Sequence, residues 1–177
     1  MKNQFKQVFY RHYWRILAIA TFVAITVIYI FSKPENLSTS LTAFLGVILS
    51  IVYFVQKQYL DETRLFNELF VRFNERYERI NEKIRDIFEY NYYGPEKIND
   101  VLDDYFNLCG EEYLFYREGR ILPIVWKSWA KGMLHYLSNS TIKEYFDAEV
   151  KGDSHYGLSY ETIVDGSNLN INPSRSS

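Results

Sequence analysis

The feature that most constrains the fold of this 177-residue chain is a pair of uncharged apolar runs separated by only three residues. Residues 16–32 and 36–56 contain no Asp, Glu, Lys or Arg. A helix needs about 20 apolar residues to cross the hydrocarbon core of a bilayer. The runs therefore predict membrane spans over about 14–32 and 37–56. Because the turn at 33–35 is so short, the two spans must be antiparallel.

Other interpretations of the two runs fit less well. A secretory signal peptide also begins with basic residues, but no small-residue cleavage site precedes Lys33 and a second apolar run follows at once. A hairpin buried in a soluble core would need more covering chain than the small, charged remainder supplies. The polar residues 38–40 could shorten the second span, although hydroxyl groups can bond to carbonyls of their own helix.

The charge distribution predicts the orientation of this hairpin, residues 13–56. The N-terminal segment 1–12 and its immediate continuation hold four basic residues and no acid: Lys2, Lys6, Arg11 and Arg15. The connecting turn holds Lys33 against Glu35. Because basic residues are retained on the cytoplasmic side, we expect a multi-pass protein of the bacterial inner membrane with both termini in the cytoplasm.

Residues 57–150 are expected to form a cytoplasmic helical domain that continues from the second span. No proline or glycine occurs from Val47 to Tyr93. Apolar residues recur there at the spacing of a coiled-coil seam, namely at Phe66, Phe70, Phe73, Tyr77, Ile80, Ile84 and Ile87. This seam predicts the core face of an intramolecular bundle, a surface for self-association, or both.

Helix signals also divide the rest of the chain. Gly94-Pro95 is typical of a helix end. Further helices are expected over residues 96–117, 123–137 and 141–150, with Asn139 or Ser140 capping the last. Residues 151–177 are rich in Ser, Asn, Gly and Asp, which predicts an extended or disordered tail. The expected fold class is therefore all-α, with a two-helix transmembrane hairpin followed by a small helical bundle.

The chain carries no recognisable catalytic or metal-binding pattern. It lacks a phosphate-binding glycine loop, a zinc-site spacing, a nucleophile elbow and a His-Glu-x-x-His motif. The single cysteine, Cys109, lies in the apolar stripe of its helix, which indicates a buried thiol. Acidic pairs such as Glu111-Glu112 are typical of solvated helix faces. We therefore expect no enzymatic activity, no metal and no cofactor.

One charge anomaly points to a ligand. Residues 57–177 carry 15 basic and 21 acidic side chains, a net charge of −6, whereas residues 113–143 have a net charge of +4. Arginine and lysine pair with phosphates, and aromatic rings stack on bases. An anionic aromatic ligand would use the basic cluster, defined as Arg117, Arg120, Lys127 and Lys131, together with Tyr116. Alternatively, these cations neutralise acidic neighbours or contact anionic lipid head groups.

Three stretches and the overall layout carry a family resemblance. The stretches are ELFVRFNERYERIN (Glu68–Asn81), YFNLCGEEYLFYREG (Tyr105–Gly119) and VWKSWAKGM (Val125–Met133), which resemble a widespread uncharacterised bacterial family. The layout of basic N-terminus, two-span hairpin and small helical domain resembles the membrane effectors of antiphage defence. In particular, it is similar to the CRISPR-associated membrane effector that binds cyclic tetra-adenylate. The resemblance implies a ligand class, and the choice of residues rests on charge alone.

Together these observations predict an oligomeric membrane effector whose cytoplasmic domain binds a cyclic oligoadenylate and perturbs the membrane. The alternative is a non-enzymatic, membrane-anchored adaptor or structural protein that associates through its long helix. The expected partners are the lipid bilayer, the cyclic oligoadenylate and further copies of the chain. Duplex nucleic acid is not expected, because a net charge of −2 provides no basic coat.

Overall fold

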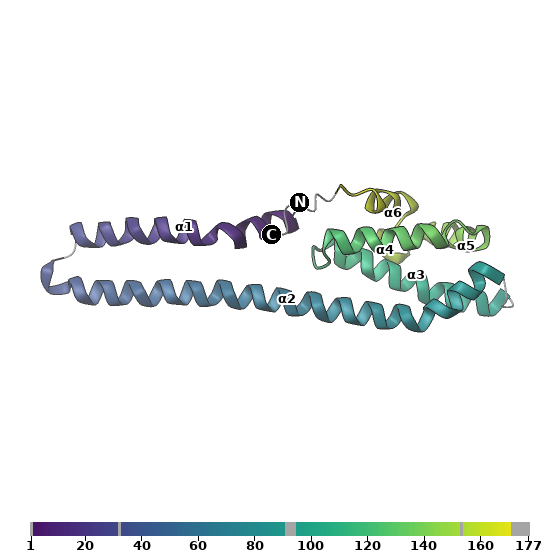
Figure 1. Ribbon diagram of the computed structural model, residues 1–177, viewed down its shortest axis with the longest axis horizontal. Helices are drawn as coiled ribbons and strands as arrows, with labels where there is room; N and C mark the ends of the chain where they lie inside the picture. Colours follow the sequence, from purple (N-terminus) through teal and green to yellow (C-terminus); the bar gives the residue numbers. More distant parts are fainter. Residues whose placement is uncertain (1, 32, 91–94, 153, 171–177) are drawn as a thin grey trace. The chain divides into compact units, whose positions relative to one another are not determined.

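The computed structural model describes residues 2–31, 33–90, 95–152 and 154–170, and that part of the chain contains helices and no strand. The elements in chain order are α1 (Lys2–Phe31), the 3-10 turn η1 (Pro34–Asn36), α2 (Leu37–Tyr90), α3 (Pro95–Arg117), α4 (Pro123–Tyr136), α5 (Ser140–Val150), the 3-10 turn η2 (His155–Gly157) and α6 (Tyr160–Ser167) (Figure 1). The all-α fold class is confirmed. Two compact units make up the chain, Met1–Arg64 and Leu65–Ser177.

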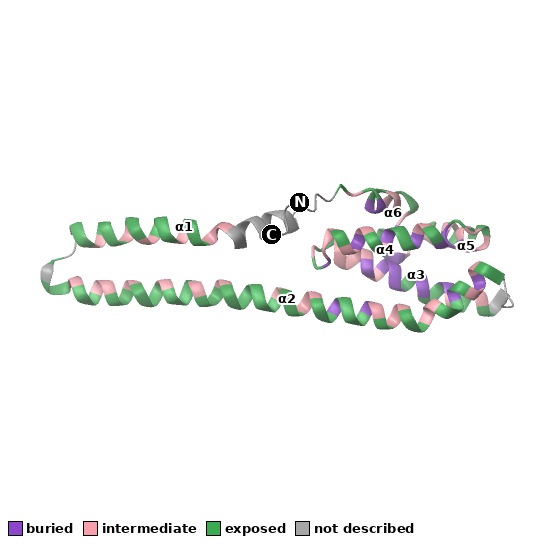
Figure 2. Ribbon diagram, in the orientation of Figure 1, coloured by how far each residue is buried: buried purple, intermediate pink, exposed green. Residues whose placement is uncertain are grey.

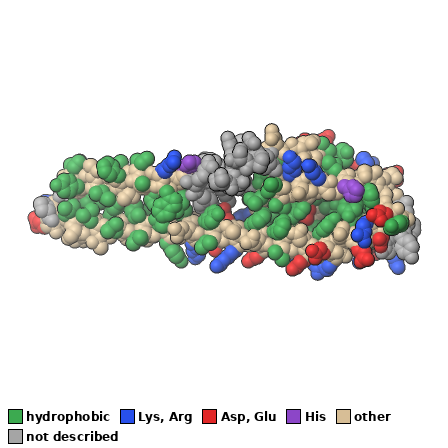
Figure 3. Space-filling view, viewed as in Figure 1, with side chains coloured by type: hydrophobic (Ala, Val, Ile, Leu, Met, Phe, Trp, Pro, Cys, Tyr) green, Lys and Arg blue, Asp and Glu red, His purple; other side chains and the backbone are tan. Residues whose placement is uncertain are grey.

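The first unit contains α1 and the first part of α2. The segment His12–Ile30 and helix α2 are each long and apolar enough to cross a membrane. Their large apolar side chains are exposed, with Phe22 at 74% and Leu49 at 69%, and Figure 3 shows hydrophobic side chains along both helices. The two apolar helices are thus confirmed, while their orientation and the bacterial inner membrane stay predictions.

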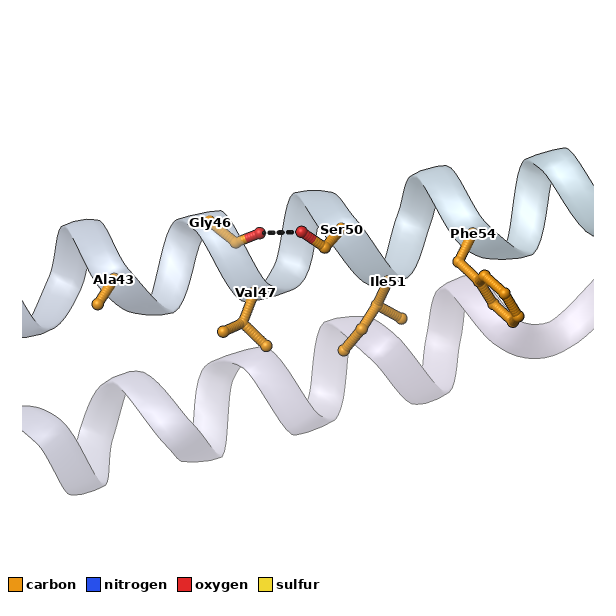
Figure 4. A pocket seen from close by; sticks show the side chains of 6 residues that line it. All are labelled: Ala43, Gly46, Val47, Ser50, Ile51 and Phe54. Carbon is orange, nitrogen blue, oxygen red and sulfur yellow. Dashed lines mark hydrogen bonds between the residues drawn. The ribbon is translucent and has the colours of Figure 1, made fainter.

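Three hydroxyl groups in the apolar parts of these helices bond to the backbone of their own helix. Thr26, Thr42 and Ser50 each donate to the carbonyl oxygen four residues earlier, at 2.8–2.9 Å. This back-bonding removes the penalty of an unpaired hydroxyl in an apolar medium. The Ser50 bond to Gly46 is visible in Figure 4, beside an open hollow of about 690 Å³ on α2. The hollow is lined by Ala43, Gly46, Val47, Ser50, Ile51 and Phe54.

Helix α2 is one uninterrupted helix, and its residues 65–90 belong to the second unit. The seam residues of this part mostly face the core: Phe73, Ile84 and Ile87 are buried, Phe66, Tyr77 and Ile80 are partly buried, and Phe70 is 38% exposed. The prediction that the seam is the core face of an intramolecular bundle is therefore confirmed. Self-association through the same helix stays a prediction.

The core of the second unit is formed by apolar residues of α2, α3, α4, α5 and the C-terminal segment with α6, and the buried positions are purple in Figure 2. Phe73 of α2 meets Trp129 of α4 edge to face at 5.8 Å between ring centroids. Phe106 of α3 meets Phe146 of α5 at 4.8 Å. Cys109 is buried in this core, as its position in the apolar stripe of α3 predicts.

The C-terminal segment is the main departure from the sequence-based expectation. The predicted extended tail over 151–177 is wrong for residues 154–170, which fold onto the bundle as η2 and α6. Leu158 and Ile163 are buried in the core. Ser159 caps α6 in a capping box with Thr162, which satisfies free amides at the helix start. A few apolar residues therefore dock the segment despite its polar composition, whereas residues 153 and 171–177 lie outside the described residues.

Candidate ligand-binding site

The basic cluster is built around the connection from α3 to α4. Helix α3 ends in a Schellman motif, in which the Gly119 amide donates to the Tyr116 carbonyl at 2.9 Å and the Arg120 amide donates to the Phe115 carbonyl at 2.8 Å. Gly119 has a φ of 73°, the left-handed conformation that this motif requires. Pro123 then begins α4. The motif thus fixes where the chain leaves α3, and with it the backbone position of Arg120.

Arg117 lies at the C-terminus of α3 and contacts the C-terminal segment. Its Nη1 donates to the Tyr156 carbonyl oxygen of η2 at 3.3 Å. Its guanidinium carbon lies 5.9 Å from the ring centroid of Tyr113, within cation–π range. The Arg117 side chain remains exposed. A phosphate could therefore reach it without displacing core residues.

Lys127 has a structural partner that sequence reasoning did not foresee. Its Nζ donates to the Leu169 carbonyl oxygen at 2.6 Å, just beyond the end of α6. This bond gives the Leu169 carbonyl a hydrogen-bond partner and ties α4 to the C-terminal segment. An anion at Lys127 would have to share or replace this bond.

Arg120 and Lys131 are exposed, and Figure 3 shows basic side chains on the face formed by α4 and α6. Within the part of the chain that the structure describes, none of the four cations of the basic cluster pairs with a carboxylate. Lys143, the fifth basic residue of segment 113–143, instead pairs with Asp147 at 2.5 Å. Neutralisation by acidic neighbours therefore accounts for Lys143 and not for the basic cluster.

Tyr116 lies between the basic cluster and the core. Its ring stacks on Trp126 with centroids 5.1 Å apart and ring planes 13° from parallel. The residue is partly buried, and burial raises the pKa of its hydroxyl. Because Trp126 covers one ring face, a ligand base would have to stack on the opposite face.

Sequence reasoning missed a buried carboxyl group. Glu112 is only 5% exposed, so its assignment to a solvated helix face is wrong. Burial raises the pKa of this carboxyl to about 8, a rise that Arg76 opposes and Glu111 reinforces. The signal was available, because positions 105, 109, 112 and 116 lie on one face of α3. Glu112 belongs to the core and not to the ligand site.

The described residues do not group into a metal site. No group of three or more His, Cys, Asp or Glu side chains among the described residues could hold a metal ion. The candidate site consists of the basic cluster and the Tyr116 ring, which are groups that bind anions and flat rings.

No protein-family profile, curated protein or solved structure matches the chain.

Proposed function

We propose that the protein is an oligomeric membrane effector of bacterial antiphage defence whose helical bundle binds a cyclic oligoadenylate through the basic cluster. The observation that carries the proposal is that the four cations have no carboxylate partner among the described residues. Cations that acids do not neutralise are available to phosphate groups, and charge-assisted hydrogen bonds to phosphate are among the stronger polar contacts.

The chemistry of the ligand fits the residue types at the site. Each nucleotide of a cyclic oligoadenylate carries one phosphodiester charge and one flat adenine. In the proposed complex, Arg117, Arg120 and Lys131 hold phosphates from exposed positions, and Lys127 joins them when it exchanges the Leu169 carbonyl for a phosphate. The free face of Tyr116 stacks on an adenine.

Membrane action is the second half of the proposal. The first unit supplies two apolar helices that are long enough to span a bilayer. Ligand bound in the bundle changes how copies associate, and that change is carried to the apolar helices, which then perturb the membrane.

Isothermal titration of the full chain in detergent micelles with cyclic tetra-adenylate tests the ligand. The double variant Arg120→Ala and Lys131→Ala removes two exposed cations, so binding should weaken by about tenfold or more for each lost contact, at roughly 1.5 kcal/mol each. Lys83→Ala, which removes an exposed cation of α2 outside the site, should bind like the unmodified chain. Absence of both heat and thermal shift from the folded chain would overturn the proposal.

The alternative function, a membrane-anchored adaptor, is favoured by exposed apolar side chains on α2 of the second unit. Phe70 is 38% exposed and Val71 is 53% exposed. An adaptor that associates through this helix would ignore nucleotides, and Val71→Glu would lower its particle mass in light scattering. Lys83→Glu is the matched control, because it places the same charge elsewhere on α2.

A further inference from the structure

The turn η2 has an unusual backbone. His155, Tyr156 and Gly157 have φ values of 59°, 58° and 82°, so three successive residues lie in the left-handed region. Glycine adopts this conformation freely, whereas residues with a Cβ do so at a cost. Strain of this kind persists only where the surrounding structure enforces it, and it concentrates at switch regions and binding sites.

The surrounding structure that enforces the turn is helix α3. A Cβ added at Gly110 would lie 2.9 Å from both Cα and Cβ of His155, which is closer than ordinary packing permits. The turn therefore presses on α3 at the one position that lacks a side chain. The Phe106 ring, one turn earlier on α3, lies 6.1 Å from the imidazole centroid.

The imidazole of His155 is held in this contact without polar partners. The residue is 8% exposed, and neither Nδ1 nor Nε2 has a hydrogen-bond partner among the described residues. Burial lowers the pKa of His155 below its ordinary value of 6.5. The charges of Glu149 on α5 and Asp103 on α3 raise the pKa of His155, but they do not outweigh the effect of burial. The docked turn thus contains a neutral imidazole.

The turn also connects the C-terminal segment to the rest of the bundle. Ser154 donates to the Glu149 carbonyl oxygen at 2.5 Å immediately before the turn. Arg117 donates to the Tyr156 carbonyl oxygen within it. Beyond it, Leu158 and Ile163 are buried in the core. Loss of the His155 contact would therefore remove one of several contacts that hold residues 154–170 on α3 and α4, and would favour their release.

We infer that His155–Gly157 is a proton-sensitive latch, which holds residues 154–170 on the bundle while the His155 imidazole is neutral and releases them when it is protonated. An imidazolium has two N–H donors, and a buried charge without partners is strongly disfavoured. Protonation and the backbone strain at Tyr156 therefore act in the same direction, toward release. The inference does not depend on the identity of any ligand.

The pH window follows from the direction of the shift. Docking stability is fully present above the ordinary imidazole value of 6.5 and is lost as the pH falls below it toward the lower value of the docked state. One proton is taken up on release, so the released fraction rises by as much as about tenfold per pH unit in this window. Glu112 stays mostly protonated in this window because burial raises its pKa to about 8.

Hydrogen exchange of the full chain in detergent micelles, corrected for the intrinsic pH dependence of exchange, tests the latch. Between about pH 7.5 and about pH 5.5, amides of α6 should lose protection by at most about tenfold, with the whole loss below the ordinary imidazole value of 6.5, while core amides of α3 keep theirs. His155→Asn removes the titrating group, and asparagine tolerates the left-handed conformation. Protection of α6 in this variant should not depend on pH in this range.

Equal protection of α6 at the two pH values in the unmodified chain would overturn the inference, as would an undiminished acid loss in His155→Asn. Tyr156→Gly provides a second variant if His155→Asn does not fold. It keeps the imidazole but relieves the backbone strain, so release should require a lower pH. A release pH that does not move in Tyr156→Gly would also overturn the latch.

Discussion

The indole of Trp126 lies against the Cα of Gly166, so that a Cβ at Gly166 would come within 2.9 Å of the indole Cε2 and closer still to Nε1. Trp126 is one of the largest fully buried side chains of the bundle. The contact joins α4 to α6 and is possible only because residue 166 has no side chain. It is the tightest point at which the C-terminal segment meets the core.

Gly166→Ala should therefore lower the free energy of unfolding by about 1–3 kcal/mol, because the added methyl group overpacks a rigid aromatic ring. Denaturant unfolding of the full chain in detergent, followed by tryptophan fluorescence, measures the change. Gly132→Ala is the matched control in α4, because a Cβ there meets nothing within 4 Å. That variant should gain about 0.5–1 kcal/mol, since alanine is favoured over glycine within a helix. Equal stability of the two variants would contradict the close contact.

Lys127 and Lys131 should differ in their effect on stability although both belong to the basic cluster. Lys127→Ala removes the bond to the Leu169 carbonyl oxygen and should cost about 1–2 kcal/mol. Lys131→Ala removes an exposed side chain and should change the stability by less than about 0.5 kcal/mol. Thermal unfolding without ligand separates the two variants. A similar loss in both would show that the Leu169 bond contributes little.

Asn139 connects two helices through its side chain. Its Oδ1 accepts from the Thr141 and Ile142 amides at 3.0 and 3.3 Å, and its Nδ2 donates to the Phe88 carbonyl oxygen at 3.2 Å. Asn139→Ala should cost about 1–2 kcal/mol, as expected for the loss of a helix N-cap. Asn139→Asp keeps the cap acceptor but loses the donor, so denaturant unfolding should place it between Asn139→Ala and the unmodified chain. If both variants lose equally, the bond to Phe88 would carry the effect.

Glu112 should make the stability depend on pH on the alkaline side. Because burial raises its pKa from 4.5 to about 8, the contribution is fully present below the ordinary value and is lost as the pH rises toward 8. The loss should be as much as about 1.4 kcal/mol per pH unit. Urea unfolding between about pH 6.5 and about pH 8.5 measures this loss of stability, because the buried Glu112 carboxyl ionises in that range. Glu112→Gln should abolish this dependence.

Glu111→Gln is the control for this pH dependence. Glu111 is partly exposed and pairs with Arg76 at 2.6 Å. Loss of this pair should cost less than about 1 kcal/mol, and the alkaline loss of stability should persist. If the stability of Glu111→Gln does not depend on pH, then Glu111, and not Glu112, causes the pH dependence.

The helices were predictable because their signals are local. The long apolar and heptad pattern of α2, the proline at the start of α4 and the asparagine cap of α5 each depend on residues within a few positions. Helix bounds taken from such signals differ from those of the structure by a residue or so at several ends, as expected where the last turn frays.

The docked C-terminal segment and the buried Glu112 were not predictable, because both depend on contacts between distant residues. Gly110 and Gly166 matter because His155 and Trp126 approach the backbone at these two positions, which the sequence does not show. Composition cannot register such contacts, so a segment with few apolar residues was assigned to an extended tail. Charge patterns located the basic cluster, but they could not reveal that the Leu169 carbonyl holds one of its lysines.

The back-bonded hydroxyl groups of the apolar helices limit the forces available for assembly in a membrane. The hydroxyl groups of Thr26, Thr42 and Ser50 already donate hydrogen bonds to carbonyl oxygens of their own helices. They are therefore not available as donors to a neighbouring helix unless that bond is first broken. At these three positions, contact with a neighbouring helix would depend on the close fit of side chains and on dispersion. Substitutions there should respond more to changes of side-chain volume than to changes of polarity.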